Sequence, residues 1–318
     1  MDLTRKLTHA DCVGRLGPII GPVIGGFLDQ AARWPWLLWF LAIVSGVLAL
    51  LYLIIGAETY APTLLAAKTK RLRKETGNVQ LRSKFDTGES AKSIFRRAIV
   101  RPTKMLCFSP IVFLLSLYMA LVYGYLYLLF TTFTYVFEDR YHFSTHAAGL
   151  TFLGLGVGNF VGLLIVGVWS DRYLKRKKAQ GLEKPEYRLP PLIIGAFSIP
   201  IGLIWYGWSA EKMVHWIVPI IGSSLVGVGL IAVFMPIQTY FVDAFTTYAA
   251  SAIAANTVLR SLFGAVLPLA GQKMYATLGL GWGNTLLGLI ALLMAPVPFL
   301  FLKYGERIRT SPRFQLKL

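Results

Sequence analysis

Acidic residues and cysteines are scarce in this chain. Only 15 of its 318 residues are Asp or Glu, against 32 Lys or Arg, and charged residues of both signs make up 15%. Two cysteines, Cys12 and Cys107, are too few for a disulfide framework, and no Cys or His spacing resembles a metal site. No nucleophile with a nearby base and no phosphate-binding glycine loop is visible. We therefore expect no enzyme, no catalytic residue, no metal and no cofactor.

Apolar residues, by contrast, make up 55% of the chain, and the mean hydropathy is +0.59. A helix needs about 20 apolar residues to cross the hydrocarbon core of a bilayer, and lipid offers no partners to an irregular backbone. The sequence therefore predicts an all-α membrane protein with one short first span and seven full ones. The expected spans are 16–28 (short), 36–56, 106–136, 147–169, 189–208, 214–241, 249–271 and 283–302.

Basic residues are distributed unevenly between the connections. The formal net charge is +17, but 24 of the 32 Lys and Arg residues lie in 57–105, in 171–188 and in the tail after residue 302. By the positive-inside rule, these alternate connections and the C-terminus face the cytoplasm. The positive charge is therefore explained by the cytoplasmic connections of a multi-pass membrane protein. For this reason we expect no nucleic-acid partner.

One long polar insert divides the spans into a group of two and a group of six. The division predicts an N-terminal part over 1–56, a basic cytoplasmic linker over 57–105, a six-helix half over 106–302 and a cytoplasmic tail over 303–318. The linker is expected to be solvated or to lie on anionic lipid headgroups, with no chemistry of its own. Six helices after a long loop are typical of one half of a transporter built from two repeats.

Two spans carry glycines four residues apart, which a helix places on one face. Such bare stripes let another backbone approach closely, and close packing drives helix association in lipid. Two interpretations are open. Each stripe packs against whichever helix is its neighbour, or the two stripes form one specific contact with each other. The first span has Gly17, Pro18, Gly21, Pro22, Gly25 and Gly26, and the fourth has Gly154, Gly158 and Gly162.

Polar side chains inside spans are the best candidates for contacts with a substrate. Arg260 is the only charged residue near the middle of a span, where a cation has to face protein or water. Its alternative role is structural, with hydrogen bonds to backbone carbonyls or to Asn256. A stripe of hydroxyl groups on the third span suits amphiphilic and cationic ligands, although core packing explains it equally well. The candidates are Tyr123, Tyr127, Thr131, Asn159, Gln238, Asn256 and Arg260.

A residue able to carry a proton across the membrane is missing from the spans. All Asp, Glu and His residues near the spans lie at their ends, whereas proton-driven transporters generally hold a titratable group inside the membrane. The sequence therefore does not reveal a coupling site.

Four motifs in order resemble the major facilitator superfamily, and within it the fungal drug and polyamine:proton antiporters. "LGPIIGPVIGGFL" (16–28) resembles the antiporter motif of the fifth helix, and "GAETYAPTLLAAKTKRLRKETGN" (56–78) the end of the sixth. "GVWSDRYLKRK" (167–177) is similar to the cytoplasmic loop motif after helix eight. "DAFTTYAASAIAANTVLRSLFGA" (243–265) is typical of helix eleven.

This resemblance implies a complete C-terminal half plus the last two helices of the N-terminal half, with the first four helices lacking. It also implies export of small amphiphilic or cationic compounds, drugs or polyamines, by proton-coupled alternating access in the plasma membrane. The rival interpretation is a truncated membrane protein that transports nothing alone or acts as an interaction partner. Within the family pattern the two glycine stripes pair across the seam between the halves.

The loop motif is expected to form a cytoplasmic gate. The end of the fourth span carries Gly167, Asp171, Arg172 and Arg176. Basic residues commonly flank a membrane span, which explains the two arginines but not Asp171. We expect Asp171 to lie at the N-terminus of the first span, where the helix dipole favours a negative charge, with Arg15 as its partner.

Overall fold

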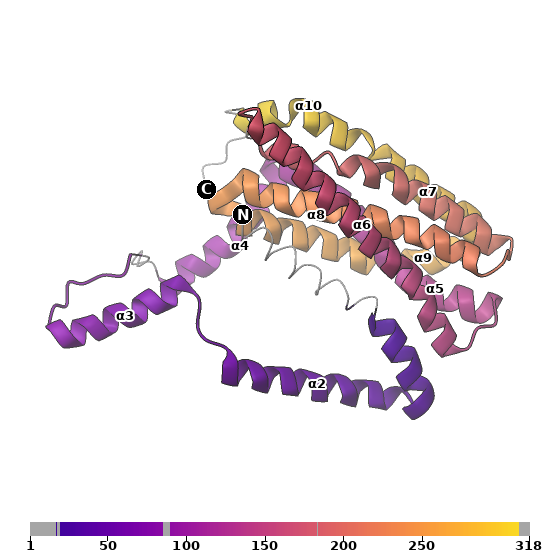
Figure 1. Cartoon of the computed structure of the whole chain (residues 1–318), viewed down its shortest axis with the longest axis horizontal. Helices are drawn as coiled ribbons and strands as arrows, with labels where there is room; N and C mark the ends of the chain where they lie inside the picture. Colours follow the sequence, from indigo (N-terminus) through magenta and orange to yellow (C-terminus); the bar gives the residue numbers. More distant parts are fainter. Residues whose placement is uncertain (1–16, 18–19, 85–89, 183, 312–318) are drawn as a thin grey trace. The chain divides into compact units, whose positions relative to one another are not determined.

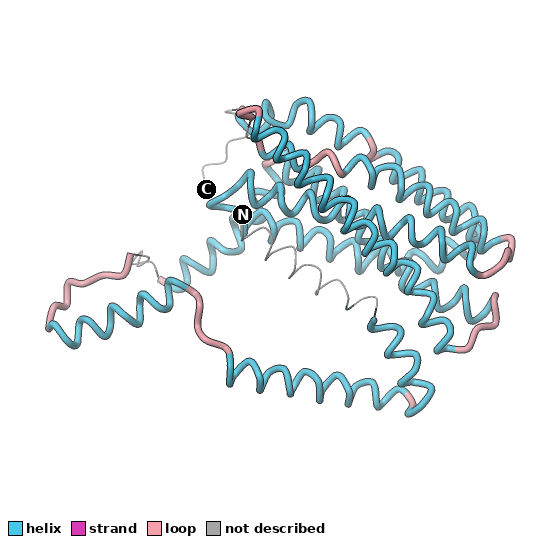
Figure 2. The backbone as a smooth tube through the Cα atoms, viewed as in Figure 1, coloured by secondary structure: helices cyan, strands magenta, loops and turns pink. Residues whose placement is uncertain are grey.

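The computed structural model describes residues 17, 20–84, 90–182 and 184–311, and every regular element in this part is helical (Figures 1 and 2). Residues 20–32 form the first helix of this part. The later helices are α2 (Trp34–Ile55), α3 (Ala61–Thr76), α4 (Ala91–Phe108), α5 (Pro110–Tyr135), the π-helical turn η1 (Val136–Arg140), α6 (Thr145–Ala179), the 3-10 helix η2 (Pro185–Arg188), α7 (Leu192–Glu211), α8 (Ile217–Phe245), the 3-10 helix η3 (Thr246–Tyr248), α9 (Ala249–Leu293) and α10 (Pro296–Thr310).

The contacts divide the chain into two units. One unit joins the N-terminal residues up to Ala31 to the segment that starts at Arg101, and the other is Ala32–Val100. Five helical stretches among the described residues are long and apolar enough to cross a membrane, and the longest of them, Ile217–Thr310, contains α8, α9 and α10. Most of the described residues in the expected spans are therefore helical.

The smaller unit contains one apolar helix and a basic helix. α2 covers most of the expected second span and has no buried residue. α3 lies inside the expected linker, so part of that linker is helical. It ends at Gly77, whose φ of 67° is the left-handed conformation that favours glycine after a helix. The basic residues Arg73 and Lys74 lie in its last turn, where the helix dipole favours positive charge.

The larger unit is a bundle formed by α5 to α10, which we call the main bundle. α5 packs along α9, α7 packs on both α8 and α9, and α6 crosses obliquely over α8 (Figure 1). Its core contains large aromatic side chains that are almost completely buried, as expected for side chains that bury 150–250 Å² each. They include Tyr118, Tyr125, Phe133, Phe137, Tyr206, Tyr240 and Phe241.

Small residues allow α8 to approach both of its neighbours. On the α7 side, a Cβ added to Gly202 would lie 2.8 Å from the Gly222 carbonyl oxygen. On the α6 side, a Cβ added to Gly162 would lie 3.0 Å from Val228 Cα. The first distance is too short for a real Cβ and the second is tighter than most Cβ contacts. The backbones therefore approach each other closely, as in other membrane helix pairs.

Two breaks differ from the expected span boundaries. The third span was expected to run from 106 to 136, but Ser109 is extended and separates α4 from α5, because Pro110 has no N–H and favours the first position of a helix. Near the C-terminus, α9 bends at Gly279 and a turn separates it from α10. The expected last span, 283–302, therefore contains parts of two helices.

The bend at Gly279 is held by a carboxylate from another helix. Gly279 has φ 74° and ψ 173°, a conformation that is almost restricted to glycine. Beyond it, the Leu280 backbone N–H donates a hydrogen bond to Glu211 Oε2 at 2.7 Å, and Arg140 Nη1 lies 3.6 Å from the same oxygen. Glu211, at the end of α7, thereby caps the second part of α9 and ties it to η1.

Candidate functional site

Arg260 lies over two aromatic rings from neighbouring helices. Its guanidinium carbon is 5.1 Å from the centre of the Tyr123 ring, on α5, and 5.8 Å from the centre of the Phe234 ring, on α8. All three residues lie well inside their helices, away from the helix ends. We call Arg260, Tyr123, Tyr127 and Phe234 the arginine–aromatic cluster.

Tyr127 extends the cluster along α5. Its hydroxyl lies 3.1 Å from that of Tyr123, one helical turn away, so one of the two hydroxyls donates to the other. Gly264, one turn after Arg260 on α9, makes room for the Tyr123 ring, because a Cβ there would lie 3.0 Å from Tyr123 Cδ1. The positions of the two tyrosines therefore depend on a glycine in the motif that also contains the arginine.

No acid compensates the charge of Arg260 in the described part of the chain. Its Nε is buried and has no hydrogen-bond partner, and none of the ion pairs between described residues includes it. Arg260 and Tyr123 are partly buried, whereas Tyr127 is 39% exposed. The cluster thus combines an uncompensated cation, phenol hydroxyls and aromatic surface at one exposed place.

The remaining candidate residues lie apart from this cluster. Asn256 is fully buried and donates from Nδ2 to Met119 Sδ, so its bond goes to α5 and not to Arg260. Thr131 donates back to the Leu128 carbonyl oxygen in its own helix. Asn159 lies where α6 meets α8, and its Oδ1 is buried without a partner. Gln238 is half-buried on α8.

Phe234 belongs to the cluster but was not a candidate in the sequence. A phenylalanine inside an apolar span is the commonest kind of core residue, so nothing in the pattern distinguishes it. Only the crossing of α8 with α5 and α9 shows that it covers Arg260. No group of three His, Cys, Asp or Glu residues that could hold a metal ion occurs among the described residues.

The two glycine stripes do not face each other along their length in the described residues. Added Cβ atoms at Gly154, Gly158 and Gly162 would all overlap or crowd residues of α8, and at Gly17 and Gly21 they would meet nothing within 4 Å. The glycine stripe of α6 therefore packs against α8, inside the main bundle. Pro18 lies outside the described residues.

The first helix nevertheless meets α6, one turn earlier along α6 than expected. A Cβ on Gly26 would lie 3.1 Å from His146 Cα, and a Cβ on Gly149 would lie 2.7 Å from the Pro22 carbonyl oxygen. The Phe27 and His146 rings are also close, with centroids 5.7 Å apart. A close contact between these two helices therefore exists. It uses Pro22 and Gly26 of the first stripe, with Gly149 in place of the stripe on α6.

The gate motif lies exposed at the end of α6. Asp171, Arg172 and Arg176 are exposed, and Gly167 has open space beside it. The expected partner of Asp171, Arg15, lies outside the described residues. Cys107 is free and exposed, and Cys12 also lies outside the described residues.

Ion pairs at this end of the main bundle join other residues. Glu186 of η2 is 4% exposed and accepts a hydrogen bond from Arg309 Nε at 2.9 Å. Arg188 lies 2.8 Å from Asp243, at the end of α8. Lys184 donates to Glu306 of α10, and this hydrogen bond raises the pKa of Lys184. The loop after α6 is therefore fastened to both α8 and α10.

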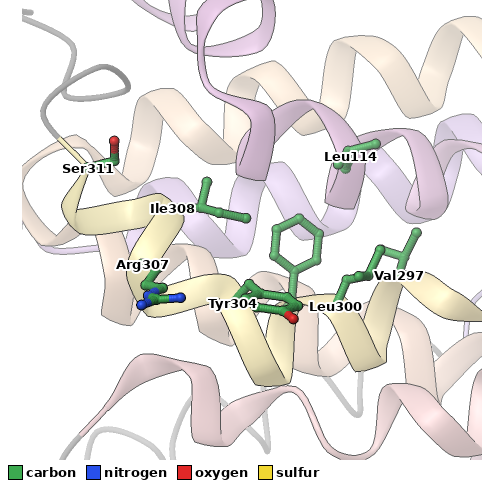
Figure 3. A pocket seen from close by; sticks show the side chains of 8 residues that line it. Leu114, Val297, Leu300, Tyr304, Arg307, Ile308 and Ser311 are labelled. Atoms are coloured by element: carbon green, nitrogen blue, oxygen red, sulfur yellow. The ribbon is translucent and has the colours of Figure 1, made fainter.

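An apolar groove of about 390 Å³ lies between α5 and α10 and is separate from the cluster (Figure 3). Figure 3 shows Tyr304 and Arg307 on α10 and Leu114 on α5. None of its lining residues belongs to the candidates from the sequence. They are Leu114, Val297, Leu300, Phe301, Tyr304, Arg307, Ile308 and Ser311.

Comparison with known proteins points to membrane transporters. The chain is 59% identical over 306 residues to the MFS-type transporter penM of Penicillium rubens, a match that covers 95% of this chain and 60% of penM. It is 53% identical over 309 residues to the MFS transporter cpaT of Aspergillus oryzae, covering 95% of this chain and 62% of cpaT. It is 50% identical over 306 residues to the efflux pump radE of Floropilus chiversii, covering 95% and 57%.

The chain spans about three fifths of the length of these relatives. Residues 4–268 match the sequence profile of the Major Facilitator Superfamily. This match agrees with the long apolar helices and with the motifs in the sequence. The chain is an integral membrane protein with an all-α bundle, and it belongs to the Major Facilitator Superfamily.

Proposed function

We propose that the chain takes part in the export of small amphiphilic compounds of the drug type by alternating access. The observation that carries this proposal is the arginine–aromatic cluster, because a mid-helix cation with partial exposure needs water or a ligand beside it. The printed name of radE, an efflux pump, supports export as the direction. We propose Tyr123, Tyr127 and Arg260 as ligand contacts.

Alternating access needs two bodies that move about a shared site. We propose that the main bundle is one of them and that the helix at 20–32 belongs to the other, with Gly26 and Gly149 at the seam. Protons are the proposed coupling ion. Because no span holds a mid-helix Asp or Glu, the coupling group is not among the proposed ligand contacts.

The proposal includes a topology in the plasma membrane. The concentration of basic residues in 57–105 and in the tail favours the cytoplasmic side for both. Epitope tags inserted after Gly77 and at the C-terminus should therefore both be protected from protease in intact cells and cleaved after permeabilisation. Cleavage of one tag in intact cells and not the other would contradict the topology.

Substitution of the proposed contacts should impair export without impairing insertion. Arg260→Ala and Tyr123→Ala should each reduce the efflux rate of a fluorescent amphiphilic dye about tenfold. Arg260→Ala removes the guanidinium with both of its cation–π contacts, and Tyr123→Ala removes one of these contacts and a hydroxyl group. The measurement is dye efflux from intact cells, normalised to the protein found in the membrane.

A matched control is available at Arg101. Its guanidinium carbon lies 5.1 Å from the Tyr248 ring centre and its Nε is also buried without a partner, but it lies on α4, away from the cluster. Arg101→Ala should export at the wild-type rate. Wild-type efflux in both Arg260→Ala and Tyr123→Ala would remove the cluster from the proposal.

A further inference from the structure

Arg260 determines the charge of the ligand that the cluster can bind. On the sequence alone, Tyr123 and Tyr127 suit cationic ligands, because aromatic faces attract cations. In the structure, the protein's own guanidinium already covers Tyr123 and Phe234. A second cation at this place would lose the aromatic faces and would be repelled by Arg260.

The hydrogen-bonding groups of the cluster are nearly all donors. A guanidinium has five N–H donors and no acceptor, and the buried Nε of Arg260 has no partner. The two tyrosine hydroxyls bond to each other, which uses one O–H and leaves the other free. The cluster therefore offers several donors and one positive charge without any carboxylate to receive them.

The same cluster offers apolar surface beside these donors, chiefly the Tyr127 ring, which is 39% exposed. The Tyr123 and Tyr127 rings have centroids 4.8 Å apart, those of Tyr123 and Phe234 are 5.7 Å apart, and the Tyr127 ring continues to Phe130 at 5.9 Å. Aromatic rings pack well against such surfaces in tilted or offset arrangements. A ligand with an aromatic skeleton can therefore pack against the exposed Tyr127 ring while an attached oxygen reaches the guanidinium.

We propose that the arginine–aromatic cluster binds aromatic ligands through an oxyanion, a carboxylate or an acidic phenolate, and discriminates against ammonium ligands of the same skeleton. The proposal rests on the proposed function only in taking this cluster as the ligand site. The oxyanion supplies the acceptor that Arg260 lacks, and hydrogen bonds between ionised partners are the strongest that a protein makes.

The test compares three ligands that share one skeleton: 1-naphthoate, 1-naphthylmethanol and 1-naphthylmethylammonium. Their dissociation constants are measured at pH 7 by calorimetry on the purified chain in lipid nanodiscs, with empty nanodiscs subtracted. We expect the carboxylate to bind at least about tenfold more tightly than the ammonium, with the alcohol between them, because a hydrogen bond to a charged group is worth at least that factor.

Variants assign the preference to Arg260. Arg260→Gln should weaken 1-naphthoate about tenfold and remove the order of the three ligands, whereas Arg260→Lys, which keeps the charge but loses the planar fork, should keep the order with a smaller ratio. Arg101→Gln is the matched control and should leave all three constants unchanged. Tyr123→Phe keeps the ring and should keep the order of the three ligands. This variant provides a second measurement if Arg260→Gln does not fold.

Two results would overturn the inference: tighter binding of the ammonium than of the carboxylate to the wild-type chain, or an unchanged order of the three ligands in Arg260→Gln. Export is read separately from cells loaded with the three ligands. If the carboxylate binds best and none of the three is exported, the proposed function fails and the inference stands. If the ammonium is exported and the carboxylate does not bind, export stands and the inference fails.

Discussion

Gly158→Ala should lower the thermal stability of the main bundle strongly, whereas Gly167→Ala in the same helix should leave it unchanged or raise it slightly. A Cβ on Gly158 would overlap the Ser224 carbonyl oxygen and lie 2.8 Å from Ser224 Cα. These are backbone atoms, so no change of rotamer can make room and α6 has to move away from α8. We expect a loss of about 3 kcal/mol, the upper part of the range for overpacked sites.

The control uses the open space beside Gly167, where a Cβ meets nothing within 4 Å. Alanine is favoured over glycine inside a helix by roughly 0.5–1 kcal/mol, so Gly167→Ala should be neutral or stabilising. Both variants are heated in detergent to a series of temperatures and then passed over a size-exclusion column. The temperature at which half of the protein still elutes as a single folded species is the midpoint. Equal midpoints for the two variants would show that α6 and α8 do not meet at Gly158.

Removal of Arg309 should destabilise the end of the bundle where η2 lies between α8 and α10. Arg309→Met leaves the buried carboxylate of Glu186 without the partner that now donates to its Oε1 at 2.9 Å. Breaking a fully buried pair costs about 3–5 kcal/mol. Because the Arg309 side chain is 28% exposed, water compensates part of the loss, and we expect about 2 kcal/mol.

The neighbouring Arg307 provides the control, since it lies exposed on the same helix and no ion pair among the described residues includes it. Arg307→Met should leave the unfolding midpoint unchanged. Adding Glu186→Gln to Arg309→Met should restore most of the lost stability, because it removes the unpaired charge. A double variant as unstable as Arg309→Met alone would show that Arg309 acts through packing instead of charge.

The positions of the helices could be predicted because lipid requires long apolar runs. α7 runs from Leu192 to Glu211, close to the expected span 189–208, and α8 runs from Ile217 to Phe245, close to the expected 214–241. The bend at Gly279 could not be predicted in the same way. It depends on a carboxylate from α7, and a sequence pattern does not show which distant residue caps a helix.

The glycine stripe of α6 shows what a sequence can and cannot indicate about packing. Gly154, Gly158 and Gly162 indicate that a backbone approaches α6 closely. They do not say which one, because the partner, α8, meets them with ordinary residues such as Ser224 and Val228. The stripe in the first span resembles a complement, but of its glycines Gly26 approaches α6, at His146, whereas Gly17 and Gly21 meet nothing within 4 Å.

Only the polar residues of the arginine–aromatic cluster could be predicted from the sequence. Arg260 and Tyr123 stand out because polar groups are costly inside a span. Their mutual position changes the expected ligand, since a tyrosine stripe alone favours cations and a tyrosine stripe under a guanidinium does not. That difference depends on the approach of α9 to α5, which lies beyond any local pattern.

The cap on the bend in α9 imposes an order of events during synthesis. Glu211 accepts hydrogen bonds from Leu280 and Gly281, which follow it by 69 and 70 residues. At the usual 5–20 residues per second, a ribosome needs roughly 4–14 s to cover that distance. During this interval the carboxylate has only water and Arg140, which precedes it in the chain, as partners. The cap that Glu211 forms on α9 is therefore completed only after α8 and most of α9 have been made.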